Sequence, residues 1–592
     1  MSKLANRGGG FLLASPDVDD VFTPEDFTEE QKMIAELTED FVEGEVVPHE
    51  EQIERQDLNL TVQLLKKAGG LGLLAADVPE EYGGTDLDKI SSTLITEKLV
   101  RGGSFALSHG AHVGIGSLPI ILFGSEEQKQ RYLPALASGE KLAAYCLTEA
   151  SSGSDALGAK TTAVLSEDGK HYVMNGSKQF ITNAGFADVF IVYAKIDGDK
   201  FTAFIVERDY PGVSTGPEEQ KMGIKGSSTR PLILEDVPVP VDNVLGEIGR
   251  GHVIAFNILN IGRYKLAAGC LGSAKWAIRL AVDYAKQRKQ FGKALAEFPL
   301  IRKKLADMAI RTFVMESMVY RTGGLMDASM SKLDKAAPDY SRKAAKAIEE
   351  YAIECSINKV FASEALDYAA DEGVQIHGGY GYIQEYKIEQ IYRDSRINRI
   401  FEGTNEINRL LIPAALLRKA LKGELPLMDV TQQLQQELIT YIPPMMMEEE
   451  PLARESAMIE AAKKIFLMVG GSAVEKYRFE LEQEQEIVEC LADVIIEVFA
   501  MESAVLRARK TMGRNGPDQA VNQAEMASVY VHEAFARIES RARTAILAME
   551  EGDRQQVQIS ILKKLSRWAP LDAIGTKRRI ASRILASGGY TT

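Results

Sequence analysis

The stretch HYVMNGSKQFITNAGFADVFIVYAKIDGDKFTAFIVE, residues 171–207, decides the fold, because apolar residues alternate with polar ones here between clear turn signals. Those signals are Glu167-Asp168-Gly169 and Asp197-Gly198-Asp199, the kind of residues that close hairpins. A further run of this type, RPLILEDVPVP, covers residues 230–240. The pattern predicts a small β domain over residues 142–250.

Helical patterns lie on both sides of this domain. Residues 27–141 place apolar residues three and four positions apart, as in EEQKMIAELTEDFVEGEVVP, which Pro48 ends. Residues 251–422 hold longer helical patterns, long enough for a four-helix bundle. The chain is therefore expected to be mainly α-helical with a β domain in the middle.

The two ends and one internal segment complete the expected domain order. Residues 1–26 form an N-terminal arm. Residues 423–450 interrupt the helical rhythm with Pro426, Pro443 and Pro444 and are predicted to be a linker. Residues 451–592 return to amphipathic helical patterns and are predicted to be an additional helical domain with a basic tail.

Composition excludes several classes of function. The 84 acidic and 69 basic residues give a net charge of −15, which argues against a general nucleic-acid binder. The four cysteines form no CxxC pair, and His109 and His112 lack companions that would complete a metal site. The scattered cysteines suggest no disulfide framework, so a reducing, cytoplasmic setting is expected. We find no signal peptide and predict no membrane-spanning helix.

Two motifs in the β domain could bind a cofactor. The loop YCLTEASSGSDA, residues 145–156, is rich in small and hydroxyl residues that suit a flavin, a pyrophosphate or a thioester carbonyl, although such loops are often plain turns. In NGSKQFITNAG, residues 175–185, period two places Phe180 and Thr182 on one face. This pair could stack on a planar ring and bond to it, or could be an ordinary cross-strand pair.

Three motifs in the second helical block carry further candidates. RKQFG, residues 288–292, and QIHGGYGY, residues 375–382, could contact a phosphate or could simply end helices. IFEGTNEI, residues 400–407, places Glu402 between Phe401 and Gly403. A carboxylate among apolar neighbours has to be paired, protonated or used in chemistry. The sequence contains no GxSxG or Walker motif that would indicate a hydrolase or a nucleoside triphosphatase.

Taken in order with YRDSR, residues 392–396, these blocks resemble the signature motifs of the acyl-CoA dehydrogenase family over residues 27–422. The resemblance implies a central β-barrel domain, noncovalently bound FAD between that domain and the four-helix bundle, and a homodimer whose second subunit completes the site. Residues 451–592 resemble the extension of the very-long-chain branch of the family, in which the extra domain replaces a second dimer or contacts a membrane. GELPLMDV, YIPPMMM and the basic tail are the candidate membrane segments.

Site residues follow from the same resemblance. Glu402 matches the catalytic base, and Gly262 stands where one branch of the family supplies a glutamate instead. Substrate binding is implied for Ser154, Asn260, Arg263 and Gly403, although an aspartate is common at the position of Asn260. FAD binding is implied for Tyr145, Leu147, Thr148, Gly153, Ser154, Phe180, Ile181, Thr182, Arg288, Gln290, Phe291, Gln375, Gly378, Gly379, Thr404 and Glu406.

The implied function is FAD-dependent conversion of a medium-to-long-chain saturated acyl-CoA to the trans-2-enoyl-CoA in fatty acid β-oxidation. Electrons would pass to an electron-transfer flavoprotein. Small residues in SFALSHGAHVGIGSLP, residues 104–119, suggest an open tunnel for a long acyl chain. Two alternatives stay open: an acyl-CoA oxidase that uses oxygen, and an assembly or scaffold protein with a residual flavin site.

Overall fold

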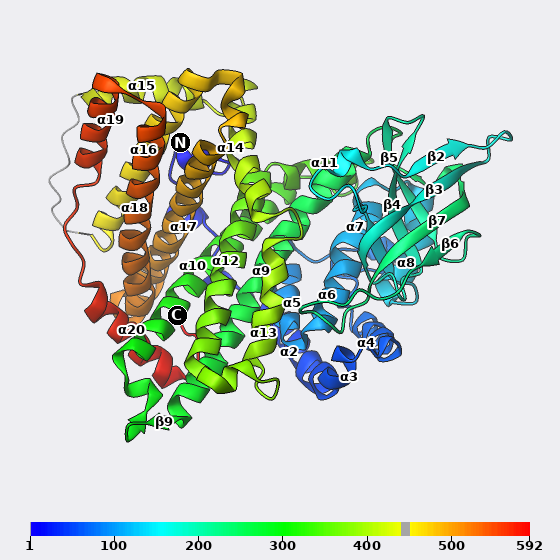
Figure 1. The fold of residues 1–592 in the computed structure, drawn as a ribbon, viewed down its shortest axis with the longest axis horizontal. Coiled ribbons are helices and arrows are strands. Elements are labelled where there is room, and N and C mark those ends of the chain that lie inside the picture. Colours follow the sequence, from blue (N-terminus) through cyan, green and yellow to red (C-terminus); the bar gives the residue numbers. More distant parts are fainter. Residues whose placement is uncertain (1, 440–449) are drawn as a thin grey trace.

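The computed structural model describes residues 2–439 and 450–592 and confirms the predicted order of helices, sheet and helices. Figure 1 shows the sheet at one end of the molecule, long helices in the middle, and the C-terminal helices at the other end. The mainly helical fold with a central β domain therefore agrees with the prediction.

The first quarter of the chain folds into helices that pack against the sheet and against the long helix α9, Gly251–Gln287. These are α2 (Glu29–Phe41), α3 (Glu50–Glu54), α4 (Leu58–Gly70), α5 (Lys89–Leu99), α6 (Ser104–Gly110), the π-helical segment η8 (Ala111–Ser117), α7 (Leu118–Phe123) and α8 (Glu126–Ser138). Local sequence fixes their starts. At α8, Gln128 N donates to Ser125 Oγ at 3.2 Å and Ser125 N donates to Gln128 Oε1 at 3.0 Å, a reciprocal cap.

One segment of this domain corrects an expectation from the sequence. Residues Ser104–Phe123 form a helical stretch that is long and apolar enough to cross a membrane, although no such stretch was predicted. Most of the stretch is buried inside the fold, where η8 packs against α9 and against strand β1, Ala143–Cys146. Length and hydropathy alone fit a membrane span and a core helix equally well.

The β domain is one twisted sheet in the order β6-β7-β3-β2-β4-β5-β8, with β1 paired in parallel to β4. Its other strands are β2 (Thr162–Leu165), β3 (His171–Thr182), β4 (Val189–Ile196), β5 (Lys200–Glu207), β6 (Val213–Thr215), β7 (Thr229–Pro240) and β8 (Val244–Leu245). The predicted barrel is wrong, because the sheet stays open between β6 and β8. These edge strands have three and two residues, too few to close it.

The middle of the molecule is the predicted bundle. Its long helices are α9, α10 (Pro299–Met330), α12 (Ala352–His377) and α14 (Asn405–Leu421), and α12 contacts the other three. Shorter elements attach to it: α11 (Tyr340–Glu349), α13 (Ile388–Ser395), and the hairpin of β9 (Lys289–Gln290) and β10 (Lys293–Ala294).

Residues 423–450, predicted as a linker, contain a helix. Helix α15, Leu427–Ile439, buries Leu434 and Leu438 and packs against α16, Ala453–Tyr477. Pro426 stands directly before this helix, where proline is tolerated, and does not break it. The predicted membrane segment YIPPMMM, residues 441–447, lies outside the described residues.

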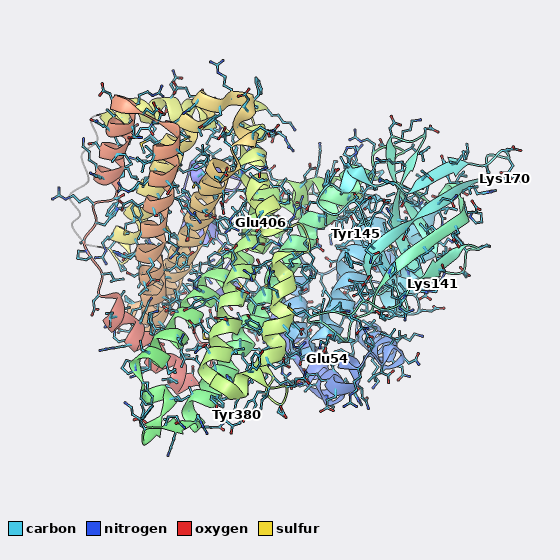
Figure 2. All side chains as sticks on the ribbon, in the orientation of Figure 1. Glu54, Lys141, Tyr145, Lys170, Tyr380 and Glu406 are labelled. Carbon is cyan, nitrogen blue, oxygen red and sulfur yellow. The ribbon has the colours of Figure 1, made fainter. Side chains whose placement is uncertain are left out.

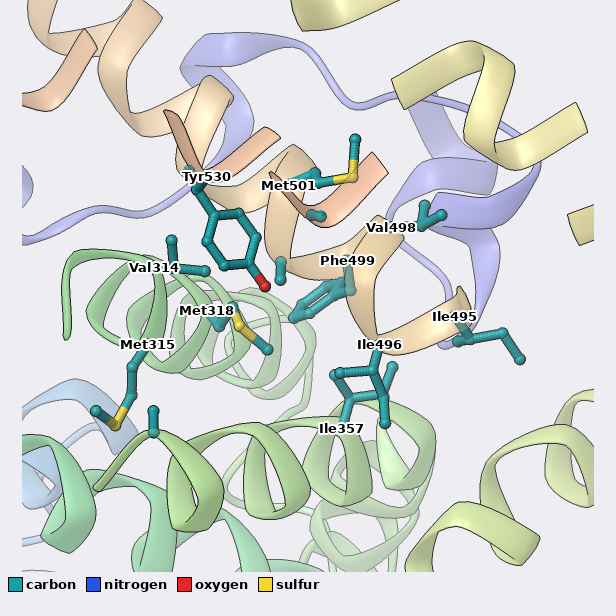
Figure 3. Close-up of a cluster of buried hydrophobic side chains, with 14 of the residues drawn as sticks. Val314, Met315, Met318, Ile357, Ile495, Ile496, Val498, Phe499, Met501 and Tyr530 are labelled. Atoms are coloured by element: carbon teal, nitrogen blue, oxygen red, sulfur yellow. The ribbon is translucent and has the colours of Figure 1, made fainter. Parts of the chain in front are cut away.

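The additional helical domain shares its core with the bundle. It contains α16, α17 (Gln485–Asn515), α18 (Val521–Met549), α19 (Gly552–Leu565) and α20 (Ala573–Ser587). Figure 3 shows side chains of α10 and α12, such as Met318 and Ile357, meeting Phe499 of α17 and Tyr530 of α18 in one buried cluster. The last domain is therefore an integral layer of the molecule.

The N-terminal arm joins the bundle to this last domain. Gly9 N donates to Glu354 Oε1 in α12 at 2.7 Å, and Glu25 pairs with Arg507 of α17 at 2.7 Å. The arm also begins with the short helix α1, Ser2–Ala5. Residues at the start of the chain thus contact elements hundreds of positions away.

Candidate active site

The IFEGTNEI motif forms a tight turn before helix α14. Glu402 and Gly403 have φ values of 58° and 78°, both in the left-handed region. Glycine adopts this conformation freely, whereas for glutamate it costs about 1–2 kcal/mol. Thr404 then caps the helix, its hydroxyl accepting a hydrogen bond from Ile407 N at 3.2 Å. A strained residue next to a helix start is typical of a functional turn.

Glu402 is half-buried, but its Oε2 atom is fully buried and has no hydrogen-bond partner in the part of the chain that the structure describes. Burial raises the pKa of Glu402 to about 7, although the positive charges of Arg263 and Lys359 oppose the rise. A carboxyl group with this pKa can hold or release a proton near neutral pH.

Gly262 of α9 makes room for this carboxyl group. A Cβ atom at position 262 would lie 2.5 Å from Glu402 Oε2 and 2.8 Å from its carboxyl carbon. Any larger residue would displace the Glu402 side chain. Gly262 stands where one branch of the family has a glutamate, and in this structure it lies directly beside the carboxyl group of Glu402.

Three donors from three helices hold the backbone of the turn. Arg263 Nε of α9 donates to Glu402 O at 3.2 Å, and Lys359 Nζ of α12 donates to Gly403 O at 2.7 Å. Asn408 Nδ2 of α14 donates to Gly403 O at 2.9 Å. Arg263 also donates to Asn260 Oδ1 at 3.0 Å, so the two residues predicted to bind substrate contact each other beside Glu402.

Tyr145 of β1 is a predicted cofactor residue whose side chain faces Glu402. Its hydroxyl is buried without a partner among the described residues, and its ring packs edge-on against Tyr193 at 5.3 Å. Burial raises the pKa of Tyr145 well above its usual value, and the charges of Tyr193 and Glu402 add to the rise. The motifs that begin at Tyr145 and Ile400 therefore meet at one site.

The structure also brings together the two motifs of the β domain. Gln179 N donates to Thr148 O at 2.8 Å, and Lys178 Nζ pairs with Glu149 Oε1 at 2.7 Å. This holds the loop with Thr148, Gly153 and Ser154 against the end of β3. Leu147 and Ile181 are buried beneath it.

The Phe180 side chain projects from the sheet near the end of β3 and is exposed. A β-bulge between Lys178 and Ile181 gives Phe180 a φ of 59°, and its side chain is 62% exposed. In the described chain, the hydroxyls of Thr148, Ser154 and Thr182 have no hydrogen-bond partner, which leaves them available to a ligand. An exposed ring beside free hydroxyls fits a planar group such as the flavin of FAD.

The other predicted FAD residues lie elsewhere on this chain. Arg288, Gln290, Phe291, Gln375, Gly378 and Gly379 are all exposed, and Phe291 is 93% exposed. The Arg288 guanidinium lies 5.5 Å from the centre of the Tyr380 ring, which joins these two motifs. Figure 2 shows Tyr380 at the far end of the bundle, away from Tyr145 and Glu406. One chain therefore forms two separate groups of candidate residues.

Two residues at the turn were missed by sequence reasoning. Lys359 and Asn408 sit within ordinary helical patterns, and nothing nearby in sequence indicates that they face a loop 44 residues and five residues away, respectively. Only the three-dimensional packing of α12 and α14 brings them to Gly403.

Family models of known proteins match most of the chain. Models described as acyl-CoA dehydrogenase N-terminal, middle and C-terminal domains match residues 28–140, 144–237 and 249–417. A second model described as an acyl-CoA dehydrogenase C-terminal domain matches residues 461–564. The last match covers the additional helical domain.

Individual relatives agree. A Bacillus subtilis (strain 168) protein, "Probable acyl-CoA dehydrogenase", is 59% identical over 99% of this chain and 98% of its own length. The bovine mitochondrial very long-chain specific acyl-CoA dehydrogenase is 36% identical over 91% of this chain and 82% of its own. The crystal structure of an acyl-CoA dehydrogenase complexed with FAD from Bacillus anthracis has a TM-score of 0.97 at 59% identity, covering 99% of this chain and 100% of that one. This chain belongs to the acyl-CoA dehydrogenase family.

Proposed function

We propose that this protein is an FAD-dependent acyl-CoA dehydrogenase that converts a medium-to-long-chain saturated acyl-CoA to the trans-2-enoyl-CoA, with Glu402 as the catalytic base. The observation that carries the proposal is the buried Oε2 atom of Glu402, which has no partner among the described residues and lies on a turn held by three helices. The Bacillus anthracis relative complexed with FAD supports the cofactor.

The residues of this chain can account for the proton step. The α-proton of a thioester is weakly acidic, so it requires a dry base whose pKa has been raised, as burial does for Glu402. In the described chain the Glu402 backbone N–H donates to no protein acceptor, so it is free to bind the thioester carbonyl and stabilise the developing enolate. When bound, FAD supplies the acceptor for the hydride that leaves the β-carbon.

Replacing the base tests this proposal. Glu402→Gln keeps the size of the side chain but cannot take a proton, so anaerobic bleaching of bound FAD by palmitoyl-CoA should fall at least ~10³-fold. Glu354→Gln is the matched control, since Glu354 is another buried glutamate whose pKa burial raises to about 7, but it faces the N-terminal arm. Equal bleaching by wild type and Glu402→Gln would contradict the proposal. A Glu402→Gln variant that keeps cellular function without bleaching would favour the scaffold alternative.

Electron transfer to an electron-transfer flavoprotein is part of the proposal, and the oxidase is its competitor. After reduction by palmitoyl-CoA, the flavin of a dehydrogenase should reoxidise slowly in air and quickly when an electron-transfer flavoprotein is added. Rapid formation of hydrogen peroxide would instead identify an oxidase.

Two glycines support a preference for long chains. A Cβ atom built on Gly110 or on Gly114 meets no atom within 4 Å outside its own local backbone; Gly110 is exposed and Gly114 is buried, so open space begins at the surface beside Gly110 and is also present beside Gly114. The segment packs against α9 and β1, which carry Gly262 and Tyr145. We therefore expect bleaching rates over a series of acyl-CoA esters to be highest above about C12. In Gly114→Met, a side chain would fill the space and shift the preference to shorter chains.

The exposed group at the far end of the bundle supports a homodimer. Arg288 lies against Tyr380, which Figure 2 shows away from Glu406 at the far end of the bundle. A second subunit could bring its own copies of Arg288, Gln290 and Phe291 to the site. Light scattering should then give twice the chain mass of 65.0 kDa. A monomer that retains a full complement of FAD would overturn this part of the proposal.

A cytoplasmic location, with peripheral membrane contact through the C-terminal region, completes the proposal. The basic tail gives this contact limited support, because two of its cations are already partly neutralised within the protein. Lys577 pairs with Asp307 and Glu533, and Arg583 pairs with Glu525. Sedimentation with anionic vesicles tests the contact directly, and loss of binding at high salt would indicate an electrostatic origin.

A further inference from the structure

Lys359 is an unusual lysine because it is buried without an ion-pair partner in the part of the chain that the structure describes. Its Nζ donates to Gly403 O and to Asn405 Oδ1, both at 2.7 Å and both neutral acceptors. No carboxylate lies within ion-pair distance of it among the described residues. The buried lysines Lys178 and Lys463, by contrast, each pair with a glutamate at 2.7 Å. A buried ammonium without a direct counter-charge is costly and requires an explanation.

The carboxyl group of Glu402 explains why a charged lysine is buried here. Its Oε2 atom has no hydrogen-bond partner among the described residues, and its negative charge can offset that of Lys359. Burial lowers the pKa of Lys359 to about 8, against the pull of Cys270, Glu402 and Glu406, while Arg263 adds to the fall. The charge of Lys359 in turn opposes the rise in the pKa of Glu402. The positive charge of Lys359 and the negative charge of Glu402 thus stabilise each other, although the two side chains form no ion pair among the described residues.

The position of Lys359 also supports the geometry of the turn. Glu402 and Gly403 are consecutive left-handed residues, and such strain persists only where surrounding contacts over-determine it. Lys359 reaches the turn from α12, and its second bond to Asn405 fixes the start of α14. Asn405 itself is held by Ser363 Oγ at 3.0 Å and Glu364 Oε1 at 3.0 Å.

We propose that Lys359 is a positioning residue for Glu402: its ammonium group holds the Glu402–Gly403 turn by bonding the Gly403 carbonyl, and its charge favours the ionised carboxylate. The proposal rests on the proposed role of Glu402 as base. Lys359 does not touch the substrate in this proposal, but it fixes the orientation of Glu402 and lowers the pKa of its carboxyl group.

Lys359→Met tests the charge and the contact together. Among the described residues, the charged or titratable groups that face Glu402 are Arg263 from α9, Lys359 from α12 and Tyr145 from β1. Removing one of two cations should move the apparent pKa in the pH profile of flavin bleaching upward by about 1 unit. The limiting rate should fall ~10-fold, because the turn loses a support. Lys359→Arg keeps the charge and should keep the wild-type pKa even where its rate falls.

Lys463→Met is the matched control. Lys463 is also buried and bonded, but it pairs with Glu502 in the additional helical domain. Its loss should lower thermal stability and leave the pH profile unmoved. An unchanged pKa in Lys359→Met, or equal shifts in both variants, would refute the proposal. If Lys359→Met does not retain FAD, Lys359→Gln, which can still donate to Gly403 O, should show the same upward shift, and an unmoved profile there refutes it equally.

The outcomes separate this inference from the proposed function. If Glu402→Gln still bleaches, the base is not Glu402 and the proposed mechanism fails, whatever Lys359 does. If Glu402→Gln is inactive but Lys359→Met keeps the wild-type profile, the mechanism stands and only the role of Lys359 is lost.

Discussion

At the scale of single residues, the protonation of Glu402 decides when the protein can act. Its pKa is raised to about 7 by burial, so the fraction of ionised base grows as the pH rises through neutrality. The rate of flavin bleaching by saturating acyl-CoA should therefore rise about tenfold per pH unit well below this pKa and level off above it. Stopped-flow bleaching between about pH 5 and about pH 9 checks this. A rate already constant at about pH 5 would show that Glu402 has an ordinary acidity.

The space under Glu402 gives a second prediction. In Gly262→Ala the new methyl group would meet Glu402 Oε2 at 2.5 Å, so the carboxylate must move. A shift of this size at a reacting atom should lower the bleaching rate by ~10- to 100-fold, with little change in stability. Gly269→Ala is the control on the same helix, because its Cβ would meet only Val100 Cγ1 at an ordinary 3.5 Å. Equal losses in the two variants would mean that the helix, not the carboxylate, is affected.

The sequence could predict some of these residues and not others. Glu402 attracts attention because an acid among apolar neighbours has to be explained, but its role as base came from the resemblance. The exposed setting of Phe180 depends on a bulge between Lys178 and Ile181 that breaks the period of two. Lys359 gave no local signal, because its contact with Gly403 arises from packing between helices.

At the scale of elements, periodicity predicted those with a clean repeat. The long helices of the bundle and the sheet between them follow directly from periods of 3.6 and two. Helix α15 was missed, since Pro426 and the later prolines read as a linker, yet a proline before the first turn is compatible with a helix. The open sheet was missed as well, because closure depends on the pairing of short edge strands, which alternation does not reveal.

The contact between the N-terminal arm and α12 gives a prediction for stability. Burial raises the pKa of Glu354 from about 4.5 to about 7, so the folded state binds its proton more tightly than the unfolded state does. The stability contributed by neutral Glu354 is full below the unfolded pKa and is lost as the pH rises through about 7, at most about 3 kcal/mol. Glu354→Gln stays neutral and can still accept the bond from Gly9 N.

This variant should therefore unfold at a higher temperature than wild type at about pH 8, and the two should converge at about pH 5. Differential scanning calorimetry at both values measures the difference. Glu350→Gln is the control, because Glu350 also accepts a bond from the arm, at Gly8 N, but its side chain is 35% exposed. A pH-independent gain in Glu354→Gln would point to packing as its cause.

At the scale of the whole molecule, buried charges tie together parts that are distant in sequence. Arg507 of α17 is 1% exposed and pairs with Glu25 of the arm at 2.7 Å and with Glu316 of α10 at 2.6 Å. Glu316 also accepts a bond from the Tyr590 hydroxyl at 2.7 Å, close to the end of the chain. Arm, bundle, additional domain and C-terminal residues therefore meet around the buried Arg507–Glu316 pair, and we expect them to unfold in one transition.

Arg507→Met tests this coupling. The substitution leaves two carboxylates without their shared cation, and breaking a buried pair in this way costs about 3–5 kcal/mol. Arg537→Met is the control, because Arg537 pairs with Glu497 but is 43% exposed, and such a pair is worth about 1 kcal/mol or less.

The destabilisation should also depend on pH. The pKa of Glu316 is lowered to about 2 by Lys275 and Arg507, so Glu316 contributes stability above its unfolded pKa and loses this contribution as the pH falls. The deficit of Arg507→Met should thus be largest near neutral pH and shrink in acid. It should appear as an earlier single transition in which FAD is released together with loss of helical signal. Separate transitions for the flavin and for the C-terminal helices would show that the additional domain folds on its own.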